Sequence, residues 1–184
     1  RGLDLTRKII PIKNTENLNL NFFTIAEMLK SKGYVNAHVG KWHLGEKGHY
    51  PKDQGFDVNI GGWESGGPRG GYFSPYSNPN LENGPDGEYL TDRLTEEAIN
   101  FIDDNKDSKF FLHLAYYSVH TPIQSKKEYS NYFKNKPSDK NHYRADYAGM
   151  IRSLDENVGK VLSKIEELNF CLLYTSDAAD EHGC

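Results

Sequence analysis

The stretch that decides the fold reads TIAEMLKSKGYVNAHVGKWHLG and covers residues 24–45. Thr24 and Glu27 are spaced as in a capping box, and Gly33 provides a C-terminal stop, so we expect a short helix over residues 24–32. Residues 34–39 then alternate between two faces. This alternation predicts a strand that ends at Gly40, with a loop beginning at Lys41.

Three more segments of the chain show periodic patterns. Apolar residues recur at helical spacing over residues 90–102 and predict a second helix, while residues 109–117 form an apolar run typical of a strand buried on both faces of a parallel sheet. A third helix is expected from an apolar face made by Tyr143, Tyr147, Met150, Ile151, Leu154, Val158, Leu162 and Ile165. The fold class is therefore α/β, a three-layer α/β/α sandwich around a mostly parallel sheet.

Residues 49–88 interrupt this pattern. They are rich in Gly, Pro, Asn, Ser and aromatic residues and carry no helical or strand period. Such a length without regular structure is typical of a functional excursion or of short irregular hairpins.

Composition limits the classes of protein that the chain can belong to. No run of about 18 apolar residues is present, which excludes a spanning helix. A net charge of −4 and scattered basic residues give no basic stripe for nucleic acid. The two cysteines, Cys171 and Cys184, leave residues 1–170 with neither a disulfide framework nor a cysteine metal site. The chain begins at Arg1, so a missing leader says nothing about its compartment.

The segment from Cys171 to Glu181 follows the third helix without a cap or turn signal. It matches, residue for residue, a translation of a common transposon-type sequencing adaptor. We therefore expect residues 1–170 to be native and residues 171–184 to be adaptor read-through, the alternative being a natural acidic tail.

Candidate chemistry lies just past the ends of the predicted strands, where parallel sheets bind ligands. Lys41 and His43 follow the first strand, and an extended backbone would point both side chains the same way, which suits an anion. His120 follows the second strand. From residue types alone, a solvated Lys41 and a His43 packed on Trp42 are open alternatives, and a His120 that only fills a loop is the more common case.

The ordered set of motifs closely resembles the formylglycine-dependent sulfatases. It consists of TIAEMLK-x-x-GY at residues 24–34, GKWHLG at 40–45, GFD at 55–57, EYLTD at 88–92, FFL at 110–112, VHTP at 119–122 and YAGMI-x-x-LDENVG at 147–159. The resemblance covers about residues 22–170. The ordered set of motifs is highly specific, whereas a lone Lys-x-His would be a weak indication of the family.

This resemblance implies hydrolysis of a sulfate ester by an alkaline-phosphatase-like fold, with a calcium ion and a formylglycine made from a cysteine. It assigns Lys41 to contact with the sulfate, His43 to the formylglycine hydroxyl and His120 to the bridging oxygen, as a candidate acid for the leaving alcohol. The family's nucleophile signature and its aspartate metal motifs do not occur in this chain. We therefore expect an internal, inactive part of a catalytic domain, with no metal ligands of its own.

Several alternatives stay open. A phosphodiesterase or phosphonate hydrolase of the same superfamily and a non-catalytic sulfoglycan-binding homologue are the competing functions. Arg69 and the aromatic residues Trp63, Tyr72 and Tyr76 could line a subsite for a sulfated sugar or simply pack the loop. We expect His113 to be a hydrogen-bonded core residue. The resemblance further implies a sulfated small molecule or polysaccharide as substrate, and a periplasmic or secreted location.

Overall fold

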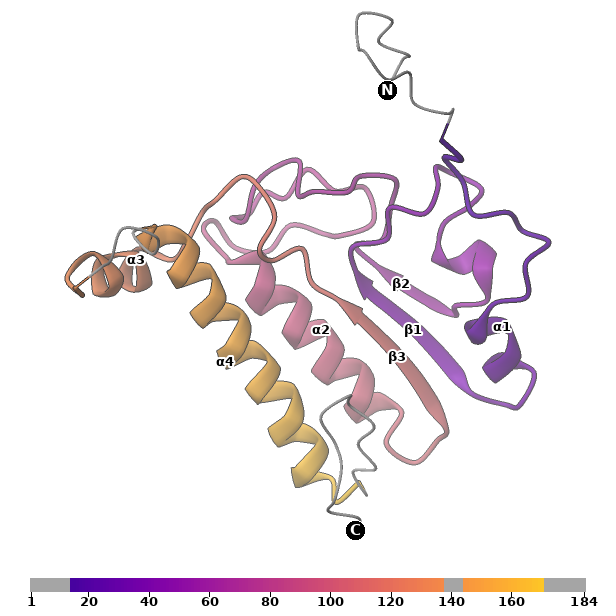
Figure 1. Cartoon of the computed structure of the whole chain (residues 1–184). Coiled ribbons are helices and arrows are strands. Elements are labelled where there is room, and N and C mark those ends of the chain that lie inside the picture. Colours follow the sequence, from indigo (N-terminus) through magenta and orange to yellow (C-terminus); the bar gives the residue numbers. More distant parts are fainter. Residues whose placement is uncertain (1–13, 138–143, 171–184) are drawn as a thin grey trace, which may run out of the picture.

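The computed structural model of the chain describes residues 14–137 and 144–170 (Figure 1). In chain order these residues form α1 (Ile25–Lys30), β1 (Val35–Gly40), the 3-10 turn η1 (Pro51–Gln54), β2 (Val58–Ile60), α2 (Leu90–Asp104), β3 (Phe110–Ala115), α3 (Lys127–Lys134) and α4 (Ala145–Glu167). The predicted α/β class is confirmed. The expected boundary at residue 171, and Tyr143 on the third helix, lie outside the described residues.

The capping box predicted at the first helix is present. The Thr24 hydroxyl accepts a hydrogen bond from Glu27 N at 3.2 Å, and the Glu27 carboxylate accepts one from Thr24 N at 2.7 Å. These two bonds satisfy backbone donors that a helix start leaves without an intrahelical partner. α1 ends at Lys30, two residues before the expected position, and Gly33, with φ at +79°, leads the chain into β1.

The three strands pair in parallel in the order β2-β1-β3. Gly40, the last residue of β1, is in register with Ala115, the last residue of β3. Because parallel strands run in one direction, their carboxyl ends meet at one edge of the sheet. The sequence did not predict β2 or α3, because β2 has only three residues and α3 is a polar eight-residue helix.

Helices lie on both faces of the sheet. Side chains along β3 alternate, so that Leu112 and Leu114 join the cluster that contains Leu94 of α2 and Met150 of α4. Phe111, the residue before Leu112, packs instead on the cluster of Ala26, Trp42 and Phe56. The expected layers of helix, sheet and helix are therefore present in the described part of the chain (Figure 1).

The expectation that β3 is buried on both faces is wrong for the described residues. Its side chains are half-buried and His113 is exposed. Within residues 14–137 and 144–170, no strand pairs with the outer edge of β3. An apolar run does not distinguish an edge strand from a central one, and for the same reason the prediction of His113 as a core residue is wrong.

The third helix buries only part of the face predicted for it. Tyr147, Ile151, Val158 and Leu162 are 37–47% exposed, whereas the buried residues of α4 are Gly149, Met150, Ser153 and Asn157. Small residues at 149 and 153 allow close packing on α2 and α3, and Asn157 donates a hydrogen bond to the Asp92 carboxylate at 2.7 Å. Within the described ranges, no helix is both long enough and apolar enough to cross a membrane.

Candidate active site

Lys41 lies at the carboxyl edge of the sheet, directly after β1. Its backbone N donates a hydrogen bond to Ala115 O at 2.7 Å, which ties the exits of β1 and β3 together. Gly40 makes this approach possible, because it has φ at +107° and a Cβ at that position would overlap Ala115 O. The Lys41 side chain is half-buried.

His43 has an exposed side chain on a left-handed backbone. Its φ is +58°, an uncommon value for a residue other than glycine. The expected extended backbone through His43 is therefore wrong, and strand alternation does not set the direction of this side chain. Instead, His43 N donates to Trp63 O at 3.0 Å, which fixes His43 to the loop of residues 61–71.

His120 follows β3 by five residues and is held from both sides. The buried Tyr72 hydroxyl donates to Tyr117 O at 2.8 Å and accepts from His120 N at 3.0 Å. Burial raises the pKa of Tyr72 to about 12, which keeps this hydroxyl a donor. The His120 ring places Nδ1 2.7 Å from Thr121 O. Because a carbonyl only accepts, Nδ1 carries the proton and Nε2 is left to exchange one.

Two adjacent glycines bring the histidines together. A Cβ on Gly66 would overlap the His43 ring, and a Cβ on Gly67 would lie 2.9 Å from His120 Nδ1. Both rings therefore pack against one dipeptide, whose shape is held by a hydrogen bond from Ser65 Oγ to Gly67 O at 2.8 Å. The glycine cluster is visible in the sequence, but nothing in the sequence shows which histidines it contacts.

Arg69 belongs to the same loop and stacks on a ring. Its guanidinium carbon lies 4.9 Å from the centre of the Trp63 ring. Arg69 is exposed, whereas Trp63, Tyr72 and Tyr76 are at most 6% exposed. The three aromatic residues therefore pack the interior of the loop, and of these four candidates for a sugar subsite Arg69 alone is exposed to a ligand.

A tyrosine and a glutamate anchor this loop, and nothing in the sequence indicates that the two are in contact. The Tyr50 hydroxyl donates a hydrogen bond to the Glu64 carboxylate. That bond lowers the pKa of Glu64 and raises the pKa of Tyr50 to about 12. Glu64 comes directly after Trp63, so the anchor holds the segment that contacts His43.

A second pair of histidines lies across the strands. His38 Nε2 is 3.2 Å from Gly40 O, so this nitrogen carries the proton, and Nδ1 accepts from His113 Nδ1 at 3.0 Å. His38 is fully buried between the Trp42 and Phe56 rings. Burial, together with His113, lowers its pKa to about 4, so His38 is neutral at pH 7.

The described residues do not fit a calcium ion or a formylglycine. Within residues 14–137 and 144–170, no three His, Cys, Asp or Glu side chains gather closely enough to hold a metal. Both cysteines of the chain, Cys171 and Cys184, lie outside the described residues. What the described residues provide is one lysine, two histidines and one exposed arginine near a single edge of the sheet.

Comparison with known proteins identifies the family. A family model described as Sulfatase matches residues 5–183. The chain belongs to the sulfatase family. N-acetylgalactosamine-6-sulfatase of Mus musculus is 31% identical over 194 residues, covering 90% of this chain and 33% of the relative. Arylsulfatase J of the same species is 31% identical over 191 residues, covering 94% and 31%.

A solved structure shares the fold. Ps i-CgsB in complex with k-i-k-neocarrahexaose superposes with a TM-score of 0.66 at 30% identity, covering 86% of this chain and 40% of that one. The chain thus spans about a third of the length of its curated sulfatase relatives.

Proposed function

We propose that the whole protein hydrolyses sulfate esters, and that Lys41, His43 and His120 act on the sulfate group. The observation that carries the proposal is the contact of His43 and His120 with the adjacent glycines Gly66 and Gly67, in a chain of the sulfatase family. Lys41 lies at the same edge of the sheet, where its backbone bonds the end of β3. A sulfate between these groups would meet one cation and two imidazoles.

The chemistry of the three side chains divides by charge. Lys41 is a compact positive charge that would stabilise the negative charge on the transferring group. His120 has Nδ1–H committed to Thr121 O, so its Nε2 would deliver a proton to the leaving alcohol. His43 would act as the base that accepts the proton of the nucleophile's hydroxyl when sulfate is expelled. We also propose Arg69 as a substrate contact, since it is exposed beside the loop.

The substrate we propose is a sulfated carbohydrate. Support comes from the relatives: one is named N-acetylgalactosamine-6-sulfatase, and i-CgsB was solved with a neocarrahexaose. Calcium and a formylglycine would be supplied by parts of the whole protein other than residues 14–137 and 144–170, and the chain alone would then be inactive. A periplasmic or secreted location, proposed from the family, suits a calcium-dependent enzyme.

The test is a substitution of Lys41 in the whole protein. The variant Lys41→Ala should lower kcat for a sulfate ester by on the order of 100-fold or more, comparable to removing one oxyanion-stabilising donor. Lys106→Ala, which removes an exposed lysine in the loop after α2, is the matched control and should leave kcat unchanged. Near-native turnover of Lys41→Ala would refute the assignment.

A further inference from the structure

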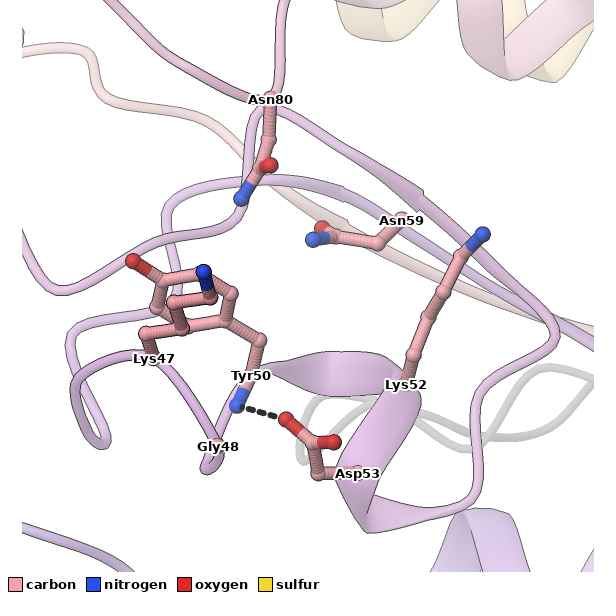
Figure 2. A pocket seen from close by; sticks show the side chains of 7 residues that line it. All are labelled: Lys47, Gly48, Tyr50, Lys52, Asp53, Asn59 and Asn80. Atoms are coloured by element: carbon pink, nitrogen blue, oxygen red, sulfur yellow. Dashed lines mark hydrogen bonds between the residues drawn. The ribbon is translucent and has the colours of Figure 1, made fainter.

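A recess lies next to the candidate active site, bonded to the same loop. Its volume is about 760 Å³, and it is lined by Lys47, Gly48, Tyr50, Lys52, Asp53, Asn59 and Asn80 (Figure 2). Figure 2 shows Asn59 and Asn80 on one side of the space and Gly48 and Asp53 on the other. Lys41, His43 and His120 do not line it.

The side chains that line the recess carry a net positive charge, with two lysines and one aspartate. Lys47 and Lys52 are exposed and form no ion pair with any described residue. The carboxylate of Asp53 accepts a hydrogen bond from Tyr50 N at 2.8 Å, so one of its oxygens is already engaged in the turn η1. The carboxylates of Glu64, which Tyr50 bonds, and of Glu46 also lie close to Tyr50, outside the lining. The two lysines of the lining, which no described carboxylate pairs with, are therefore the groups available to an anion.

The neutral groups of the recess suit hydroxyls. Asn80 Nδ2 donates to Gly62 O at 2.7 Å, whereas its Oδ1 accepts no hydrogen bond from the described residues. The second oxygen of Asp53 is a further acceptor, and the half-buried ring of Tyr50 offers an apolar surface. An anionic group together with hydroxyls and a ring face is the chemistry of an acidic sugar unit, and 760 Å³ is ample for one.

The same residues are bonded to the loop of the candidate active site. Asn59 and Asn80 both donate to Gly62 O, at 2.9 and 2.7 Å. Tyr50 donates to Glu64, two residues before the glycine that contacts His43. The recess and the site therefore share one loop, and a chain of sugars could reach both.

We propose that this recess binds a second anionic sugar unit of the substrate, through Lys47 and Lys52, while the hydrolysed sulfate lies at Lys41. The inference rests on the proposed function and deepens it. The substrate is an oligosaccharide with at least two anionic groups, and a monoester with a single sulfate is a poorer substrate. The second anion is a sulfate or a carboxylate, which share the same recognition by ammonium groups.

The experiment measures binding of three tetrasaccharides to the whole protein by titration calorimetry. A carrageenan tetrasaccharide carries sulfate without carboxylate, a hyaluronan tetrasaccharide carries carboxylate without sulfate, and an agarose tetrasaccharide is neutral. The double variant Lys47→Ala/Lys52→Ala should weaken binding of at least one anionic tetrasaccharide by about tenfold, which corresponds to two exposed ion pairs. The tetrasaccharide that is weakened identifies the anion.

The matched control removes the same charge elsewhere. Lys106→Ala/Lys160→Ala takes two exposed lysines from the loop after α2 and from α4, and should bind all three sugars as the wild type does. The proposal is overturned if neither anionic tetrasaccharide binds the wild type, if the pocket variant binds both unchanged, or if the control loses as much. Release of sulfate from 4-nitrophenyl sulfate is assayed in parallel: its absence from the wild type refutes the proposed function, whichever way the binding result falls.

Discussion

Lowering the pH from 7 to 5 should destabilise the whole protein through His38. This imidazole is fully buried and has a pKa of about 4, against an ordinary value of 6.5 in the unfolded chain. A histidine with a lowered pKa in the folded state contributes its full stability above pH 6.5 and loses it as the pH falls toward 4, because the unfolded state binds the proton first. At pH 5 the unfolded state is almost fully protonated at this site and the folded state is not.

The two pKa values set the size of the effect. Between pH 7 and pH 5 the linkage amounts to about 2 kcal/mol of unfolding free energy for this one group. The cost has a structural cause: a proton on His38 Nδ1 would face the N–H of His113 Nδ1, 3.0 Å away, within a layer of aromatic rings.

Urea unfolding of the wild type and of His38→Gln at both pH values isolates the effect. Glutamine does not titrate and its amide can still donate to Gly40 O, so the titrating groups that do not contact His38 cancel in the difference between the two proteins. The wild type should lose about 2 kcal/mol more than the variant between pH 7 and pH 5. An equal loss in both proteins, or a smaller loss in the wild type, would refute the argument from burial.

Three further substitutions test the loop, the sheet and the first helix. Gly66→Ala should lower kcat at least tenfold, with a smaller change in the free energy of unfolding, because the new Cβ would displace the His43 ring. Steady-state kinetics measures this, and an unchanged kcat would show that Gly66 does not position His43. Gly40→Ala should destabilise the protein by more than about 2 kcal/mol in urea unfolding, because φ is +107° and the new Cβ would overlap the backbone of Ala115. An unchanged free energy of unfolding would contradict the close approach of Gly40 to Ala115. Thr24→Ala should cost about 1 kcal/mol through loss of the capping box, and Thr24→Ser, the conservative control, should cost less.

The elements that the sequence predicts correctly are those with a long period or a specific cap. α2 buries Leu90, Leu94, Ala98, Phe101 and Ile102 as its spacing indicates, and Thr24 caps α1 as predicted. Errors arise where neighbours decide burial. α4 buries Met150 of its predicted stripe, but it buries Ser153 and Asn157 in place of Ile151 and Val158, because small and hydrogen-bonding residues permit close contact with α2.

The candidate site shows the same division. That Lys41, His43 and His120 follow strand ends could be read from the sequence, because parallel strands expose their carboxyl ends at one edge. The contact of the two histidines with Gly66 and Gly67 could not, since it depends on how a glycine-rich loop without any period folds back over the sheet. The Tyr50 to Glu64 bond, between residues of two loops, was equally invisible.

The most direct test of the proposed activity is a comparison of two esters with the whole protein. Release of 4-nitrophenol is measured from 4-nitrophenyl sulfate and from bis(4-nitrophenyl) phosphate, and each kcat/KM is determined again for Lys41→Ala. We predict a higher kcat/KM for the sulfate ester, lost by on the order of 100-fold in the variant. A higher kcat/KM for the phosphodiester, or hydrolysis of neither ester, would contradict the proposed sulfate ester hydrolysis.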